Sequence, residues 1–282
     1  MNGVNGGSMR LFDLKDRVAV VTGSTKGIGR GIAECLAAAG AQVVVSSRNQ
    51  AECDATAAQL ATAYPGTNCY GVRCDVGDAA SIQSFVENIK ARSGGIDILV
   101  CNAARMPKLV PFGEVADAEF LAQFDTNVVK TLKLCLLAAE SMQQRSAGSI
   151  VLIGSRTGLV PAPQQLAYSC AKAAETHLAR NLAAHFAADG IRVNCIAPGL
   201  IRSDSASIVF DDPAAIAAFS RDIPLHRGGE PHEIGGAVVF LASAAAGYVT
   251  GVTIPVDGGV VGLPPSPGSS SPTFDATRRS KP

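Results

Sequence analysis

Short apolar runs rich in Val and Ile alternate along this chain with longer Ala-rich stretches in which apolar residues recur at helical spacing. The short runs are typical of strands buried on both faces, and the longer stretches are typical of amphipathic helices. The runs predict strands at residues 18–22, 43–46, 68–73, 98–101, 149–153, 192–197 and 253–256. The stretches between them predict helices, among them 31–39, 51–63, 81–91, 117–142, 167–187 and 231–241. This alternation predicts an α/β fold: a doubly wound parallel sheet of about seven strands with helices on both faces.

No linker-like stretch interrupts the alternation, so we expect a single domain over residues 14–262. Residues 1–13 are expected to form a flexible segment, and the Pro/Ser-rich residues 263–282 a disordered tail. Residues 202–227 break the rhythm, because they place apolar side chains among polar and Pro residues between the sixth and seventh strands. They predict a substrate lid above the strand ends. The alternative is an ordinary connection, although such connections are usually shorter.

Composition narrows the classes of protein that need to be considered. The chain is 47% hydrophobic and 17% charged, with a formal net charge of zero, so nothing suggests nucleic-acid or membrane binding. The eight cysteines are scattered singly, without a Cys-x-x-Cys pair, which argues against a metal site and a disulfide framework. No segment has the composition of a secretory signal or a membrane span. We therefore expect a cytoplasmic protein without a metal.

A glycine-rich turn follows the first predicted strand and precedes a helix. Its glycines are Gly23, Gly27 and Gly29, spaced Gly-x-x-x-Gly-x-Gly. Glycine lets backbone approach a ligand closely, and the free N–H groups at a helix start attract anions such as phosphates. A tight turn alone would also use glycine. The position after the first strand of a βαβ series favours a dinucleotide site.

Polar or conformationally special residues also follow the later strands. They are Arg48, Asp75, Asn102, Ser155 and the pair Pro198–Gly199. Each has an ordinary alternative, such as a helix N-cap for Asp75 and a turn residue for Asn102. Parallel strands bring their carboxyl ends to one rim, where open α/β sheets bind ligands. Their shared placement predicts a ligand site at that rim.

Tyr168 and Lys172 are four residues apart in a predicted helix, so both side chains project from one face. The ammonium stabilises phenolate, which makes Tyr168 a candidate proton donor and acceptor. Ser155 ends a buried strand thirteen residues upstream and would reach the same place. These three residues predict acid–base chemistry on an oxygen-bearing substrate.

Several short motifs occur along the chain in a specific combination and order: Thr22-Gly23-x-x-x-Gly27-x-Gly29, Cys74-Asp75-Val76, Asn102-Ala103-Ala104, Asn127-Val128, Ser155, Tyr168-x-x-x-Lys172, Pro198-Gly199 and Val256-Asp257-Gly258-Gly259. On these motifs the chain resembles the short-chain dehydrogenase/reductase family over nearly all of residues 14–262. Two departures are Ala104, where the family has glycine, and Ser203, where it often has threonine. The first should be tolerated if Ala104 avoids a positive φ. The resemblance implies a Rossmann-like fold and a homotetramer or homodimer built through the helices at 117–142 and 167–187.

The resemblance also implies site residues. The catalytic residues would be Asn127, Ser155, Tyr168 and Lys172, with Asn127 holding a water that links Lys172 to solvent; satisfying buried backbone is the alternative role for Asn127. Asp75 would bind the adenine amino group, Val76 would supply a backbone contact, and Asn102 would flank the adenosine ribose. Lys172 would hold the nicotinamide ribose, and the backbone of Ile201 would contact the carboxamide. The full expected cofactor set is Gly23, Ser24, Thr25, Lys26, Gly27, Ile28, Gly29, Ser47, Arg48, Asp75, Val76, Asn102, Ala103, Ala104, Tyr168, Lys172, Pro198, Gly199, Ile201 and Ser203.

The residues after the second strand bear on the choice of cofactor. An NAD site places Asp or Glu there to accept hydrogen bonds from the ribose 2′-hydroxyl. This chain has Ser46, Ser47 and Arg48 instead, where the two serines would add small hydrogen-bond donors for a phosphate. Lys26 adds a positive charge in the glycine-rich turn. Arginine binds phosphate through two N–H groups, whereas the alternative is a solvated strand-end residue. We therefore expect NADP(H), with NAD(H) less favoured.

The function implied is NADP(H)-dependent interconversion of a ketone and a secondary alcohol, with Tyr168 as general acid and base. The residues expected beside the substrate are mostly apolar: Met106, Leu109, Val110, Phe112, Leu159, Val160, Ile208 and Phe210. Arg105 and Arg156 could recognise an acidic substrate, or could be structural. One alternative is a 3-oxoacyl-thioester reductase, which Asp189 weakens because family members of that kind carry a basic residue there. Another is a non-catalytic NADP-sensing regulator.

Overall fold

A computed structural model of the chain describes residues 9–107 and 109–263. The predicted tail from 264 onward and the first eight residues of the predicted flexible segment lie outside the described residues. Within them, Met9–Phe12 form a 3-10 helix ahead of the first strand. No helix in the described ranges combines the length and apolar character needed to cross a membrane.

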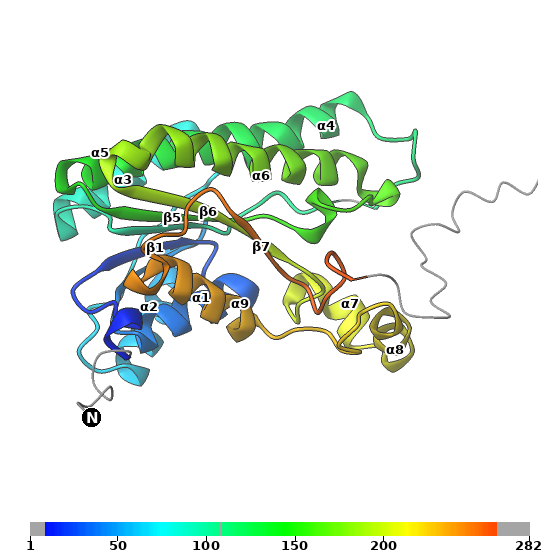
Figure 1. Cartoon of the computed structure of the whole chain (residues 1–282), viewed down its shortest axis with the longest axis horizontal. Helices are drawn as coiled ribbons and strands as arrows, with labels where there is room; N and C mark the ends of the chain where they lie inside the picture. Colours follow the sequence, from blue (N-terminus) through cyan, green and yellow to red (C-terminus); the bar gives the residue numbers. More distant parts are fainter. Residues whose placement is uncertain (1–8, 108, 264–282) are drawn as a thin grey trace, which may run out of the picture.

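The described residues form one sheet of seven strands in the order β3-β2-β1-β4-β5-β6-β7, and every pairing is parallel (Figure 1). The predicted doubly wound sheet is therefore confirmed. The strands are β1 (Val18–Thr22), β2 (Gln42–Ser46), β3 (Tyr70–Gly71), β4 (Ile98–Cys101), β5 (Gly148–Ile153), β6 (Ile191–Pro198) and β7 (Thr253–Val256). The strand order reverses between β1 and β4, which is where such folds open a crevice for a ligand.

The edge strand β3 is shorter than the run at 68–73 predicts. Beyond Gly71 the backbone still bonds β2, but the side chain of Gln50 takes the outer positions. Its amide donates to Gly71 O at 3.1 Å, and its Oε1 accepts from Arg73 N at 2.7 Å. A side chain thus covers an exposed sheet edge that would otherwise present unpaired backbone groups.

Helices cover both faces of the sheet. One face carries α1 (Gly27–Ala38), α2 (Gln50–Ala63) and α9 (Pro231–Ala242), and the other α3 (Ala79–Ser93), α4 (Asp117–Phe124), α5 (Thr131–Arg145) and α6 (Leu166–Phe186) (Figure 1). The predicted helix at 117–142 is divided by a π-helical turn, Asp125–Lys130. Two short helices, α7 (Ser207–Phe210) and α8 (Pro213–Arg221), lie in the predicted lid.

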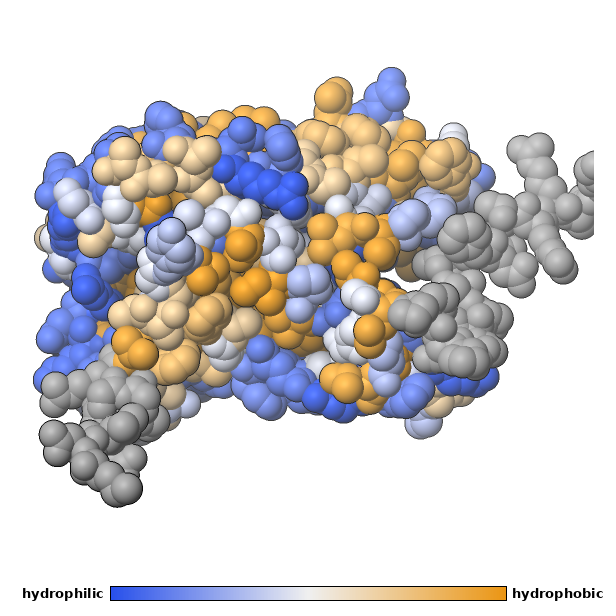
Figure 2. Space-filling view, viewed as in Figure 1, coloured by the Kyte–Doolittle hydropathy of each residue, from blue (hydrophilic) through white to orange (hydrophobic). Residues whose placement is uncertain are grey.

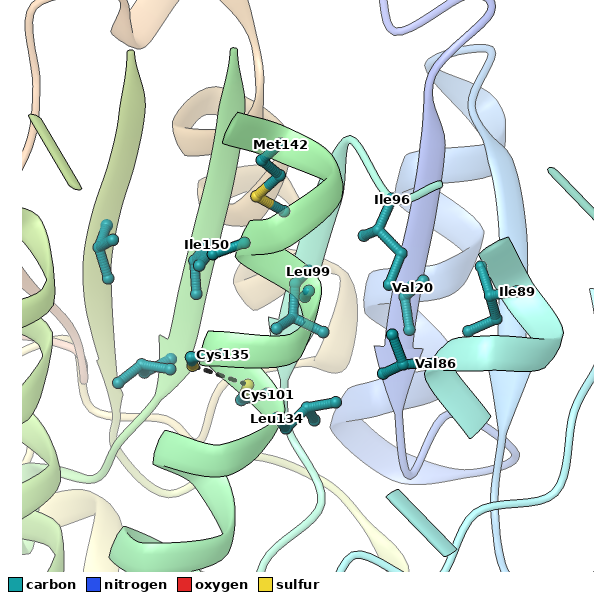
Figure 3. Close-up of a cluster of buried hydrophobic side chains, with 14 of the residues drawn as sticks. Val20, Val86, Ile89, Ile96, Leu99, Cys101, Leu134, Cys135, Met142 and Ile150 are labelled. Atoms are coloured by element: carbon teal, nitrogen blue, oxygen red, sulfur yellow. Dashed lines mark hydrogen bonds between the residues drawn. The ribbon is translucent and has the colours of Figure 1, made fainter. Parts of the chain in front are cut away.

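The two core layers are built from alternating residues of the same strands. In β1, Val18 and Val20 belong to the layer under α3, α5 and α6, whereas Ala19 and Val21 belong to the layer under α1, α2 and α9. Figure 3 shows the first layer, with Val20 near Val86 and Ile89 of α3, and Leu99 and Ile150 near α5, which carries Leu134 and Met142. Because both faces are buried, the period of two is hidden in the sequence as a continuous apolar run.

Most cysteines behave as the small core residues that their apolar surroundings predict. Five of them are buried, and all eight are free thiols. The sulfurs of Cys101 and Cys135 lie 3.8 Å apart, between β4 and α5 (Figure 3). Burial raises the pKa of Cys74 to about 12 and that of Cys195 to about 11, so these thiols stay uncharged near neutrality.

Glycines allow α1 and α9 to pack with their backbones in close approach. A Cβ at Gly31 would lie 2.5 Å from Pro231 Cβ, and one at Gly235 would lie 2.5 Å from Cys35 Sγ and 2.8 Å from Gly31 O. At Gly236, the next residue of α9, an added Cβ would meet nothing within 4 Å. Helix α1, which begins in the glycine-rich turn, is therefore held by a helix near the other end of the domain.

Gly235→Ala is expected to destabilise the fold by about 1–3 kcal/mol, because the added methyl has to displace the backbone of α1. Gly236→Ala is the matched control and is expected to raise stability by up to about 1 kcal/mol, because alanine is the better helix former. Denaturant midpoints of the two variants measure the contrast. Equal effects would show that the close contact between α1 and α9 does not limit packing.

Candidate functional site

The glycine-rich turn has the geometry of an anion site. Gly23 and Gly27 adopt positive φ angles of 66° and 55°, which favour glycine. A Cβ at Gly29 would collide with Gly23 O and would lie 2.5 Å from Asn102 Nδ2. Helix α1 starts at Gly27, and its N-cap residue Lys26 makes no side-chain capping bond. The first N–H groups of α1 therefore lack a side-chain cap and can receive an anion such as phosphate.

Thr22 and Asn102 join the ends of β1 and β4. Thr22 Oγ1 accepts hydrogen bonds from the backbone N–H groups of Asn102 and Ala103, both at 3.0 Å. In return, Asn102 Nδ2 donates to Thr22 O at 2.9 Å and to Gly23 O at 3.1 Å. The predicted ribose contact of Asn102 thus comes from a residue whose side chain also fixes the glycine-rich turn. The part played by the Thr22 hydroxyl was not predicted from the sequence.

The other residues of the turn differ in where their side chains lie. Ser24 is buried, its hydroxyl donating to Val21 O at 2.7 Å and accepting from Ser46 N at 2.9 Å, so it ties β1 to β2. Thr25 and Ile28 are partly exposed. Lys26 is exposed and forms an ion pair of 3.4 Å with Asp204 of the lid.

After β2, the two predicted phosphate ligands are placed differently. Ser47 shares hydrogen bonds with the backbone of Asn49, which caps α2. Arg48 is exposed, and its guanidinium makes no hydrogen bond or ion pair to any described residue. The idea that Ser46 supplies a further donor is wrong, because its hydroxyl is fully buried at the end of the strand.

The end of β3 places Asp75 and Val76 at the same rim. Asp75 Oδ1 accepts from Gly77 N at 2.9 Å, and Val76 packs against the core. The alternative role of Asp75 as a helix N-cap is wrong, because Asp78 caps α3 through Ala80 N and Ser81 N. The Asp75 carboxylate is partly exposed at the strand end, as a base-binding residue requires.

The loop after β4 is held by Asn127. Asn127 is buried in the π-helical turn; its Oδ1 accepts from Arg105 N at 2.9 Å, and its amide donates to Gln123 Oε1 at 2.8 Å. Its alternative role, satisfying buried backbone, is therefore confirmed, while water binding stays a prediction. Ala104 has no positive φ, so the missing family glycine is tolerated as expected.

The two arginines that could recognise an acidic substrate differ in whether their guanidinium groups already have a partner. Arg105 binds Glu119 through two bonds of 3.2 and 2.7 Å and is structural. Arg156, next to Ser155, makes no hydrogen bond or ion pair within the described residues. Burial lowers the pKa of its guanidinium, and Asp257 and Asp222 partly oppose this. Arg156 thus stays available for a ligand.

The candidate acid–base residues come together at the ends of β5 and α6. Ser155 follows β5, is partly buried, and shares a hydrogen bond of 2.9 Å with Thr157 Oγ1. Tyr168 lies in the first turn of α6 and is partly exposed. Lys172 Nζ lies 5.8 Å from the centroid of the Tyr168 ring. The helical spacing therefore places the ammonium near the phenol, as expected.

Lys172 also has a buried partner that was not predicted. Its Nζ donates to Glu175 Oε2 at 2.6 Å and to Ile153 O at 2.9 Å, and both side chains of the ion pair are 2% exposed. Burial alone lowers the pKa of Lys172, but Glu175 and Tyr168 raise it by more, so it is raised overall. Burial raises the pKa of Glu175, against the opposing effect of Lys172. The spacing of three residues on one helix was the available signal.

The end of β6 leads into the lid. Gly199 N donates to Val256 O at 3.0 Å, and a Cβ at Gly199 would lie 2.6 Å from Asp257 Cα. Ile201 is buried and forms a parallel bridge with Gly229. A Cβ at Gly27 would lie 3.2 Å from Ser203 Cβ, so the lid starts against the glycine-rich turn. Farther along, in the segment predicted to be a lid, Ile208 is 83% exposed.

Comparisons with known proteins place this arrangement in a family. The family described as enoyl-(acyl carrier protein) reductase matches residues 23–261. The cattle protein named dehydrogenase/reductase SDR family member 4 is 38% identical over 253 residues, 90% of each chain. The 3-oxoacyl-(acyl-carrier-protein) reductase of Escherichia coli is 36% identical over 249 residues, covering 88% of this chain and 99% of that protein.

A solved structure gives the same result for the fold. The gluconate 5-dehydrogenase of Burkholderia cenocepacia, in complex with NADP and tartrate, has a TM-score of 0.86 and is 31% identical. The match covers 91% of this chain and all of that one.

Proposed function

The chain belongs to the short-chain dehydrogenase/reductase family and is an oxidoreductase of CH–OH and C=O groups, and we propose that it is an NADP(H)-dependent ketone reductase. The observation that carries the proposal is the buried cation of Lys172, which lies beside the Tyr168 ring and bonds Ile153 O, two residues before Ser155. These residues lie at the rim that also holds the glycine-rich turn. When bound, the nicotinamide supplies the hydride.

The protein's own residues manage the oxygen and its proton. Ser155 and Tyr168 hydrogen-bond the carbonyl oxygen of the substrate, and Tyr168 donates its proton as negative charge develops there. Lys172 stabilises the phenolate that remains. Asn127 holds the loop after β4 through its bond to Arg105 N. It is also proposed to bind a water that returns a proton to Tyr168 through Lys172. In oxidation the same residues act in reverse.

The proposed cofactor site uses the features of the turn and of the β2 end. The uncapped start of α1 receives the pyrophosphate, and the space that a Cβ at Gly29 would fill is left open. Arg48, unpaired among the described side chains, receives the 2′-phosphate. The Lys26–Asp204 pair is exposed on both sides and therefore weak, so Lys26 can turn to the phosphate. The NADP bound by the gluconate 5-dehydrogenase supports this choice.

The proposed substrate is a medium-sized ketone or keto-ester. Met106, Leu109 and Phe112 are more than half exposed on the loop after β4, and Val110 borders Tyr168. Apolar side chains around a few polar groups suit such a ligand. The unpaired Arg156 extends the range to ketones that carry a carboxylate. For a carrier-bound thioester, Asp189 is unfavourable, because carrier-protein reductases of the family usually have a basic residue there. Its carboxylate instead accepts a bond from Gln143 at 2.7 Å.

We further propose a cytoplasmic homotetramer, with a homodimer as the smaller alternative. Leu121, Val129 and Leu136 are exposed on the predicted interface helices. Apolar residues also gather over β7 in the middle of the face shown in Figure 2. Strand β7 is a sheet edge, and proteins commonly cover an apolar edge with a second chain.

Tyr168→Phe is expected to lower kcat by about 10²–10⁴-fold, because only the proton donor is removed. NADPH should still bind with similar affinity, which a fluorescence titration measures. Tyr248→Phe is the control, since Tyr248 is fully exposed. Turnover close to normal in Tyr168→Phe would rule out the proposed acid–base role.

NADPH is expected to be preferred over NADH by at least about tenfold in kcat/KM, which requires only about 1.4 kcal/mol of differential binding. Arg48→Asp should erase or reverse the preference, because a carboxylate repels the 2′-phosphate and suits the free hydroxyl. The same change at the exposed Arg180 of α6 should leave it intact. An unmodified enzyme that uses NADH equally well would contradict the assignment.

A panel of free ketones, keto-esters, keto-acids and a carrier-bound 3-oxoacyl thioester, followed at the nicotinamide absorbance, tests the substrate class. The free carbonyl compounds should be turned over at least as well as the carrier-bound thioester. A clear preference for the thioester would establish the alternative reductase activity instead. Bound NADPH without any carbonyl-dependent oxidation would favour the regulatory alternative.

A further inference from the structure

The buried partner of Lys172 changes what the lysine can offer to a ligand. An ammonium has three N–H donors. Two of them are used inside the protein, by Glu175 Oε2 at 2.6 Å and by Ile153 O at 2.9 Å. Only one N–H donor remains for the cofactor ribose or for Tyr168. Glu175 therefore fixes the direction in which the ammonium points.

The titratable side chains packed around the Lys172–Glu175 ion pair are uncharged near neutral pH. Tyr168 faces it from α6, Cys195 from β6, and Cys101 from β4, where Cys101 lies against Cys135 of α5. Burial and neighbouring groups raise the pKa of both Cys195 and Cys101, so these thiols are uncharged near neutrality. Lys172 and Glu175 are thus the charged groups among the described residues packed here.

We propose that Glu175 is a positioning residue that cancels the charge of Lys172 and so makes Tyr168 hold its proton more tightly. The proposal rests on the proposed function for its catalytic meaning, but its electrostatic content concerns these three side chains alone. Glu175 has no place in the Ser155–Tyr168–Lys172 grouping, and it acts through Lys172.

The net charge of the buried unit, formed by Tyr168, Lys172 and residue 175, determines the direction of the effect. With Glu175 ionised, loss of a proton from Tyr168 or Lys172 takes the unit from neutral to one negative charge. With an uncharged residue at 175, the same loss takes it from one positive charge to neutral. In a poorly solvated site, going from neutral to a net charge is harder than going from a net charge to neutral, whichever group gives up the proton. Glu175 therefore raises the pH at which the unit deprotonates.

This effect suits one direction of the reaction. Reduction of a ketone requires Tyr168 with its proton, and oxidation of an alcohol requires it without. An ion pair that holds the proton on Tyr168 keeps the reductive form populated to higher pH. The geometry therefore favours reduction as the direction served at neutral pH.

The test is a phenolate titration by ultraviolet absorbance. The chain has four tyrosines, so subtraction of the Tyr168→Phe titration isolates Tyr168. In Glu175→Gln the midpoint should move to lower pH by about one unit or more, since a nearby charge typically shifts it by that much. The pH at which kcat/KM for ketone reduction falls on the alkaline side should move by the same amount as the absorbance midpoint. An unchanged midpoint and an unchanged alkaline fall of kcat/KM would overturn the proposal.

Matched variants separate charge from structure. Glu175→Met also removes the charge and should give the same shift, so it serves if Glu175→Gln does not fold. Glu175→Asp keeps the charge and should titrate like the unmodified chain; a shift as large as that of Glu175→Gln would refute the proposal. Glu140→Gln removes a glutamate from an equally short ion pair, 2.6 Å from Lys90, and should leave the titration unchanged.

The readouts also distinguish this proposal from the proposed function. If the unmodified chain oxidises NADPH with ketones but the absorbance midpoint ignores residue 175, Glu175 has no such role and the proposed function stands. If the midpoint moves as expected in a chain without turnover, the proposed function fails and the coupling stands. A variant that lowers only the melting temperature, with both pH readouts unmoved, counts against the proposal.

Discussion

The hydrogen bonds between Thr22 and Asn102 hold together the two strands on which the site depends. Strands β1 and β4 are neighbours in space, but the chain leaves them in opposite directions across the sheet. No covalent turn joins their ends, so side chains have to fix them. Because Asn102 also bonds Gly23 O, the same contact sets the shape of the glycine-rich turn. The position of the predicted phosphate site and that of the loop leading to Asn127 are therefore coupled.

The two halves of the rim offer different groups to a ligand: backbone N–H groups in one half and a buried ion pair in the other. The half of the site around Gly23 offers N–H groups and exposed cations for a large anionic ligand. The half around Tyr168 contains Lys172 and Glu175, whose charges cancel in the interior. A buried pair of this kind contributes little net stability, because both ions lose their hydration. The proposed effect of Glu175 on the neighbouring phenol, rather than support of the fold, would account for its presence.

The sequence predicts the elements well where one physical rule dominates. Buried parallel strands require runs of β-branched residues, and the bounds of β1, β4 and β7 were predicted to the residue. The residues predicted from strand ends, such as Asp75, Asn102 and Ser155, lie at one rim, since parallel strands bring their carboxyl ends together. What could not be predicted depends on partners distant in the chain. Arg105 could be assigned to structure only once Glu119 was placed beside it, and the outer edge of β3 is covered by Gln50 of α2.

Glu175 is a different kind of omission, because its partner is only three residues away. The spacing was visible, but burial was not: the same pair on an exposed helix face would be ordinary and weak. Burial of α6 against β5 and β6 turns it into a strong local constraint. The fold class thus follows from local patterns, whereas the electrostatics of the site follow from packing.

The contact between α1 and α9 has a consequence for the order of events during synthesis. Translation proceeds from the N-terminus, so the glycine-rich turn and α1 leave the ribosome long before residues 231–242. Until α9 emerges, the face of α1 that carries Gly31 and Cys35 has no partner, and the apolar layer below it is incomplete. A nascent chain truncated before Pro231 therefore carries every motif of the cofactor site without the support that shapes it. Contacts of such long sequence separation also slow folding.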